Sequence, residues 1–201
     1  MSEIREISGT LGGAGRRFAV VASRFNERVV DGLLTGAVDS LRRYGVAAED
    51  VQVVRVPGAW EIPLALEELA RAGGWDGLVA LGAVIRGETA HFDYICAECS
   101  RGIAAVGERH QLPVGFGLLT CETTEQAEAR SGATAGNKGR EAAEATLEMA
   151  TLLSRLRGEQ RTFEQGDAGG PVERVDHKGH PGHAGHARGP RSVTPAPGSR
   201  T

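Results

Sequence analysis

Four short apolar runs alternate with longer amphipathic segments between residues 17 and 157, and this alternation restricts the fold more than any other feature. Strands and helices in this order form parallel strands joined by right-handed crossovers, with helices on both faces of the sheet. The sequence therefore predicts a three-layer α/β/α sandwich with a four-stranded parallel sheet, flavodoxin-like in class. The predicted strands are RFAVVAS (17–23), VQVVRV (51–56), DGLVALGAVI (76–85) and PVGFGLLT (113–120).

The segments that follow the apolar runs predict helices. In the first of them, Val30, Leu33 and Ala37 recur at helical spacing, and Gly45 can end the helix. In the second, Pro63 comes early enough to be tolerated in a first turn. The five predicted helices span approximately residues 30–44, 60–73, 91–109, 123–130 and 137–156, and Thr123 or Thr124 is the predicted cap of the fourth helix.

The two ends of the chain differ in composition from the middle. Residues 1–16 form a polar, glycine-rich lead, and its GTLGGAG stretch precedes the first strand, so it is not a phosphate loop between a strand and a helix. Residues 158–201 contain no Leu or Ile and are predicted to be a disordered tail, because they cannot bury enough apolar surface. Residues 17–157 are therefore the predicted folded domain. The tail histidines, at every third position from His177 to His186, are interpreted as part of a solvated segment.

Composition and charge narrow the possible functions. A net charge of −3 and a pI of about 6.1 argue against nucleic-acid binding. The absence of a leader-like or membrane-spanning apolar run predicts a cytoplasmic protein, and Cys96, Cys99 and Cys121 are then expected to be reduced thiols. The spacing of CAEC (96–99) resembles half of a zinc site, but no second pair accompanies it, so no metal is predicted.

Ligands of parallel sheets bind beyond the carboxyl ends of the strands, and four polar segments lie there. RGETAH (86–91) is the richest of them. Gly87 permits a tight turn, residues 88–90 are expected to open a helix whose free amides bind an anion, and His91 falls in its first turn. His91 then has two interpretations, a proton-transfer residue or a partly exposed helix residue behind a Thr89 cap. The other segments are SRFNE (23–27), PGAWE (57–61) and LTCETTEQ (119–126).

The aromatic residues of two of these segments are also ambiguous. Phe25 and Trp60 are either core residues, which is the more common role, or exposed rings that stack on a planar ligand. Glu61 has a purely structural interpretation as well, because an acidic side chain stabilises the positive end of a helix.

Taken together, these segments resemble the 6,7-dimethyl-8-ribityllumazine synthase family. The resemblance covers about residues 17–157 and rests on motifs in family order: SRFN, VPGAWEIPLA, ALGAVIRGETAHFDYI, PVGFGLLT and EQAEARSGATAGNKG. It implies condensation of 5-amino-6-(D-ribitylamino)uracil with 3,4-dihydroxy-2-butanone 4-phosphate, giving the lumazine, phosphate and water. This is the penultimate step of riboflavin biosynthesis, and it requires no metal or organic cofactor.

The resemblance also implies a role for individual residues. His91 is the implied proton-transfer residue, and Phe25 the ring that stacks on the pyrimidine. Phe116 is expected to close the pocket from the fourth strand. The implied pyrimidine and ribityl contacts come from Ala59, Trp60, Glu61, Ala83, Val84 and Ile85, and the implied phosphate contacts come from Glu88, Thr89, Arg130 and Lys138.

In the family the active site lies between neighbouring subunits of a pentamer, so the resemblance implies a homo-oligomer as the only macromolecular partner. Phe116, Arg130 and Lys138 would come from one chain, and Phe25, Glu61 and His91 from the next. Some family members assemble twelve pentamers into a 60-subunit icosahedral shell. The short linker SGATAGNKG (131–139) favours the shell, because members that stop at the pentamer typically have an insertion there.

Three other functions remain open at this level: a shell protein without catalysis, an archaeal-type riboflavin synthase that joins two lumazines, and a paralogue that binds flavin or lumazine without turnover. Retention of Phe25, His91 and Arg130 argues against the first. The patterns RGETAHFDY and AGNKG favour lumazine synthase over the second. Turnover on the two substrates separates the enzyme from the first and third.

Overall fold

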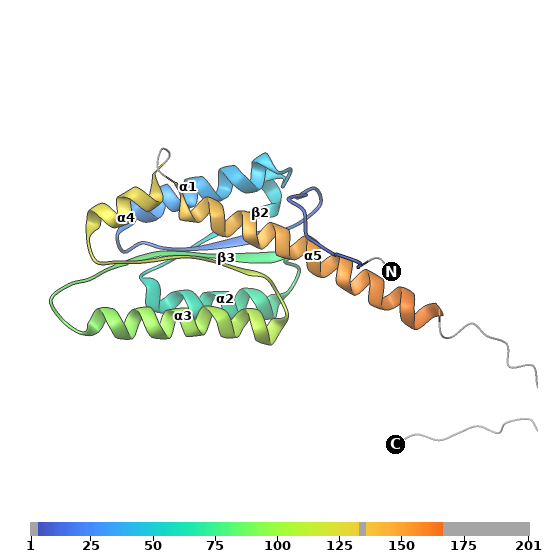
Figure 1. The fold of residues 1–201 in the computed structure, drawn as a ribbon. Helices are drawn as coiled ribbons and strands as arrows, with labels where there is room; N and C mark the ends of the chain where they lie inside the picture. Colours follow the sequence, from blue (N-terminus) through green and yellow to red (C-terminus); the bar gives the residue numbers. More distant parts are fainter. Residues whose placement is uncertain (1–3, 133–135, 167–201) are drawn as a thin grey trace, which may run out of the picture.

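The computed structural model describes residues 4–132 and 136–166, with side chains as far as residue 158. A parallel sheet lies between two layers of helices, with α1, α4 and α5 on one face and α2 and α3 on the other (Figure 1). The predicted three-layer sandwich is therefore confirmed. Within the described ranges, no helix is both long enough and apolar enough to span a membrane.

The four strands are β1 (Phe18–Ser23), β2 (Val51–Val56), β3 (Gly77–Ile85) and β4 (Val114–Cys121). They lie in the order β2-β1-β3-β4, and every neighbouring pair is parallel. This is the flavodoxin-like order, in which the chain changes direction across the sheet between β1 and β3. All four strands were predicted to within one residue at each end.

The helices agree less closely with the sequence prediction. The first begins earlier than the predicted residue 30, and a separate 3-10 turn precedes the second. The last helix was predicted to end near residue 156, but it continues to Gly166, while residues 167–201 of the predicted tail lie outside the described ranges. The bounds are α1 (Glu27–Arg43), η1 (Ala48–Asp50), η2 (Ala59–Glu61), α2 (Ile62–Ala72), α3 (His91–His110), α4 (Thr124–Ser131) and α5 (Lys138–Gly166).

The core has two halves, one on each face of the sheet. All six residues of β1 are buried, and successive side chains of the strand point into opposite halves of the core. Phe18 and Val20 pack with α1 and α5, whereas Ala19 and Val21 pack with α2 and α3. Because both faces of β1 are covered, the strand is apolar from Phe18 to Ala22 rather than alternating, and only its last residue, Ser23, is polar.

Helices α1 and α5 approach closely at Gly139. A methyl group at this position would overlap the carbonyl oxygen of Leu33 on α1. Beside it, the Asn137 amide donates to the carbonyl oxygens of Gly32 and Ser131 at 2.8 and 3.0 Å, and its oxygen accepts from the backbone of Arg140. These contacts fix the first turn of α5 and therefore the position of Lys138.

The N-terminal lead lies along α5 and reaches the amino-terminal edge of the sheet, where Arg16 pairs with Asp76 at 3.0 Å. The backbone amide of Thr10 donates to the Thr151 hydroxyl at 2.7 Å, and the Arg155 guanidinium donates to the Ser8 carbonyl at 2.7 Å. The glycine-rich stretch is part of this packing, because a side chain at Gly9 would overlap the backbone of Glu148.

We expect Gly139→Ala to lower the free energy of unfolding by about 2 kcal/mol, since one buried methyl group must displace the α1 backbone. The matched control is Gly158→Ala on the same helix, where a Cβ meets nothing within 4 Å; it should be neutral or slightly stabilising. Urea denaturation of both variants measures the difference, and equal midpoints would contradict the close approach of α1 and α5.

Candidate functional site

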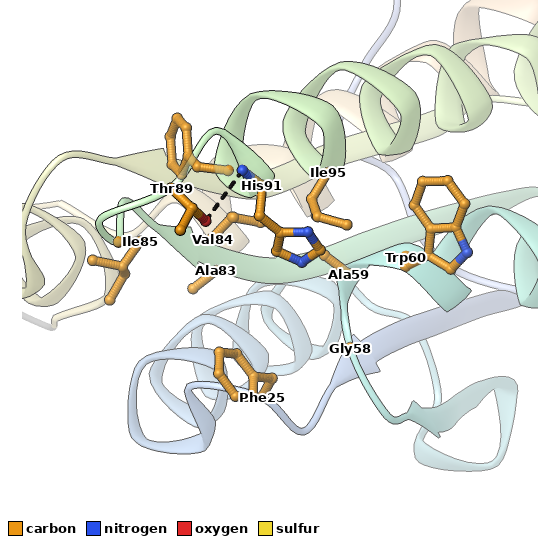
Figure 2. A pocket seen from close by; sticks show the side chains of 12 residues that line it. Phe25, Gly58, Ala59, Trp60, Ala83, Val84, Ile85, Thr89, His91 and Ile95 are labelled. Atoms are coloured by element: carbon orange, nitrogen blue, oxygen red, sulfur yellow. Dashed lines mark hydrogen bonds between the residues drawn. The ribbon is translucent and has the colours of Figure 1, made fainter.

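A cavity of about 350 Å³ lies beyond the carboxyl ends of β1 and β3, where the strand order reverses. The turns that follow β1, β2 and β3 enclose it, together with the first turns of α3. Figure 2 shows the imidazole of His91 directed toward the space bounded by Phe25 and Trp60. The cavity is lined by Phe25, Gly58, Ala59, Trp60, Ala83, Val84, Ile85, Gly87, Thr89, His91, Phe92 and Ile95.

The turn after β1 presents Phe25 to solvent. Its backbone amide donates to the Pro57 carbonyl at 3.1 Å, which ties this turn to the one after β2. Asn26 adopts the left-handed conformation, with φ of 59°, and its side chain donates to the Ala83 carbonyl at 2.8 Å. Phe25 is consequently 71% exposed at the mouth of the cavity, so the interpretation of this ring as a core residue is wrong.

The 3-10 turn η2 provides the wall that includes Ala59 and Trp60. The Glu61 carboxylate accepts from the Gly58 amide at 2.8 Å, which confirms its structural role at the start of this turn. Trp60 is 57% exposed rather than a core residue, whereas Ala59 is buried and its carbonyl accepts from the Cys99 thiol at 3.0 Å. Glu61 itself lines an adjoining hollow beside Tyr94, which shares Trp60, His91 and Ile95 with this cavity.

Helix α3 begins at His91, which confirms the start of the predicted range 91–109, but the prediction that residues 88–90 open the helix is wrong. Glu88 and Thr89 lie in the bend between β3 and α3, and the Thr89 hydroxyl accepts from the His91 amide at a long 3.4 Å (Figure 2). Thr89 lines the cavity, while Glu88 is exposed and does not. The bend before His91 therefore keeps the imidazole at the cavity, and the His91 amide itself is paired with Thr89.

The remaining predicted residues line a second cavity of about 280 Å³ in the same chain, formed by β4, α4 and the start of α5. Phe116 is 50% exposed there. The Arg130 guanidinium donates to the Gln126 carbonyl at 2.8 Å, and the Lys138 ammonium pairs with Glu141 at 2.6 Å. Within one chain, His91 and Arg130 thus line different cavities.

Four lining residues were not among the site residues assigned from the sequence, namely the two turn glycines Gly58 and Gly87 and the side chains of Phe92 and Ile95. The helical period contained the signal for one of them, because Ile95 lies one turn after His91 and so shares its face of α3. Among the described residues, no group of three or more His, Cys, Asp or Glu side chains could hold a metal ion.

Doubly wound parallel sheets bind their ligands at the topological switch point, and a cavity there that is lined by aromatic rings and a histidine is typical of α/β proteins that bind small molecules. The comparisons with known proteins narrow this class. The profile of a family described as 6,7-dimethyl-8-ribityllumazine synthase matches residues 15–154. The chain therefore belongs to the 6,7-dimethyl-8-ribityllumazine synthase family.

Individual relatives agree with the family match. A 6,7-dimethyl-8-ribityllumazine synthase from Desulfovibrio desulfuricans is 54% identical over 156 residues, which cover 78% of this chain and 100% of that protein. Proteins of the same name from Salinibacter ruber and Desulfatibacillum aliphaticivorans are 52% and 50% identical, and the matches cover 76% of this chain in both cases and 97% and 99% of those proteins.

The site geometry predicts the reactivity of the Cys99 thiol. Burial raises the pKa of this thiol to about 12, so about one molecule in 10⁴ carries the reactive thiolate at pH 8. We expect iodoacetamide at pH 8 to modify Cys99 only after unfolding, and the half-buried Cys96 to react earlier. Peptide mass spectrometry over time measures both, and rapid labelling of Cys99 in the native protein would contradict its contact with Ala59.

Proposed function

We propose that this chain catalyses the condensation of 5-amino-6-(D-ribitylamino)uracil with 3,4-dihydroxy-2-butanone 4-phosphate to 6,7-dimethyl-8-ribityllumazine. The observation that carries the proposal is the division of the expected site residues between two cavities on one chain. The first cavity is lined by Phe25, Trp60 and His91. The second is lined by Phe116, Arg130 and Lys138. Neither cavity alone contains the groups that this reaction needs.

The first cavity suits the ribitylaminouracil. Phe25 stacks on the pyrimidine ring, which explains why a phenyl ring is exposed at the mouth of the cavity. The backbone of residues 83–85 at the end of β3 contacts the ring edge, and Ala59, Trp60 and Glu61 hold the ribityl chain. An apolar cavity with a few directed polar groups is typical of such a binding site.

The second cavity suits the phosphate of the other substrate. Arg130 and Lys138 supply positive charge, and Arg130 can exchange its present contact with the Gln126 carbonyl for a two-pronged contact with phosphate oxygens. Phe116 closes the pocket beside them. The backbone at Glu88 and Thr89, together with the first amides of α3, completes the phosphate site from the opposite cavity.

The chemistry needs proton transfers and charge stabilisation, which these residues provide. The substrate amine attacks the butanone carbonyl, and the carbinolamine loses water to give an imine. Phosphate then leaves, and ring closure with a second loss of water yields the lumazine. His91 moves protons between these steps, and Arg130 stabilises the departing phosphate. Much of the acceleration is positioning of two reactive substrates.

The proposal requires a homo-oligomer in which the first cavity of one chain faces the second cavity of its neighbour. A cyclic pentamer satisfies this requirement because each interface is heterologous, so every chain contributes one half to each of two sites. We further propose the 60-subunit shell on the grounds of the short linker before α5. Electron microscopy of the full-length protein distinguishes the shell from a free pentamer.

We expect His91→Ala to lower kcat about 100-fold without abolishing turnover, because a proton-transfer group contributes only part of the acceleration. The appearance of lumazine fluorescence measures the rate. His110→Ala on the same helix is the control, since His110 contacts Glu67 at the opposite end of α3. An unchanged rate for His91→Ala would contradict the assigned role.

A mixing experiment tests the shared site directly. Arg130→Ala and His91→Ala chains should each assemble with very low activity. Co-expressed at equal amounts, they should recover activity, because about a quarter of the interfaces in a random ring combine an intact His91 with an intact Arg130. Activity that stays at the level of the single variants would show that both residues act within one chain or not at all.

A further inference from the structure

Arg86 joins the turn after β3 to two other segments. Its two terminal nitrogens donate to both oxygens of Asp93, at 2.9 and 3.2 Å, and its Nε donates to Glu122 at 2.7 Å. The guanidinium carbon also lies 4.1 Å from the centre of the Phe92 ring. The backbone amide of Arg86 donates to the Cys121 carbonyl at 2.9 Å, so both the main chain and the side chain of Arg86 contact the end of β4.

These partners connect the two cavities of one chain. Asp93 lies in the first turn of α3, two residues after His91, and Phe92 lines the first cavity. Glu122 follows β4, and its backbone amide donates to the Gln126 side chain at 2.9 Å. Gln126 in turn lines the second cavity and accepts from Arg130 through its carbonyl. Arg86 thus stands between the segment that carries His91 and the segment that carries Arg130.

A guanidinium is the appropriate group for these contacts. The forked contact with Asp93 fixes the orientation of the plane, a third donor reaches Glu122, and the flat face remains free to lie against Phe92. The hydrogen bonds from Arg86, together with its positive charge, lower the pKa of the Asp93 carboxyl, so Asp93 stays ionised at neutral pH. Without that charge, two carboxylates would face each other at the base of the turn.

We propose that Arg86 is a positioning residue that holds the turn of residues 86–91 in place to bind the substrate phosphate and to present His91. This inference rests on the proposed function, since it concerns the same two cavities. The pyrimidine wall is held by other hydrogen bonds, from the Asn26 side chain to the Ala83 carbonyl and from the Gly58 amide to the Glu61 carboxylate, and neither involves Arg86. Loss of Arg86 should therefore affect the phosphate substrate much more than the ribitylaminouracil.

The test compares Arg86→Gln with Arg101→Gln. Arg101 also pairs with an acidic residue on α3, Glu98, but it is more exposed and its partner lies on the same helix, away from both cavities. We expect Arg86→Gln to raise the KM for the butanone phosphate about 10-fold and to lower kcat, while the KM for the ribitylaminouracil changes less than about twofold. Arg101→Gln should leave all three constants unchanged.

Two further variants keep the inference testable if Arg86→Gln does not fold. Glu122→Gln and Asp93→Asn each remove one anchor and keep the size of the side chain, so each should reproduce part of the KM effect. Arg86→Lys should recover only part of the activity, because an ammonium cannot contact both carboxylates and lie flat on Phe92.

The outcomes separate the two proposals. A wild-type protein that forms no lumazine refutes the proposed function. An active wild type whose Arg86→Gln, Glu122→Gln and Asp93→Asn variants match Arg101→Gln refutes the role of Arg86. Equal increases in both KM values, accompanied by a lower melting temperature, would show a general loss of structure and would also overturn the inference. A selective increase in the KM for the phosphate substrate supports it.

Discussion

The parallel pairing of β1 with β3 is the interaction on which the rest of the structure depends. The register from Phe18↔Gly77 to Ala22↔Leu81 brings the ends of two strands together that are far apart in the sequence. The connections that follow β1 and β3 cross to opposite faces of the sheet. A cavity therefore forms between the carboxyl ends of these two strands, and no core side chain fills it. Burial of both faces of β1 makes this pairing the apolar centre of the molecule.

The turns at this edge of the sheet are held by hydrogen bonds rather than by burial. Asn26 bonds to the end of β3, Glu61 closes the turn after β2, and Arg86 ties the turn after β3 to the turn after β4. Polar contacts of this kind leave Phe25 and Trp60 exposed without loss of order. The exposed rings are then available to a ligand or a neighbouring chain. Exposed apolar surface promotes aggregation of a monomer, but it provides binding surface in a site shared between chains.

The sequence predicted the strands more accurately than the site. Short apolar runs bounded by glycine and polar residues are typical of strands in a parallel sheet, so the sequence predicted all four strands. The predicted range of α3 began at the correct residue, but residues 88–90 were also expected to open the helix, because a cap at Thr89 and a bend before His91 have the same local pattern. Phe25 and Trp60 could be assigned only by resemblance, since an aromatic residue after a strand is compatible with core and surface alike.

The order of strands and helices along the chain can be read from the period of the apolar residues and from the turn residues. This order was sufficient to determine the layers of the sandwich and the edge of the sheet where the site lies. Only the tertiary structure decided that His91 and Arg130 line separate cavities, and that Arg86 lies between the two segments that carry them. The physical reason is that local periodicity specifies which face of an element is buried. Distances between side chains on different elements depend on strand order, crossover direction and close contacts such as that at Gly139, which no local pattern encodes.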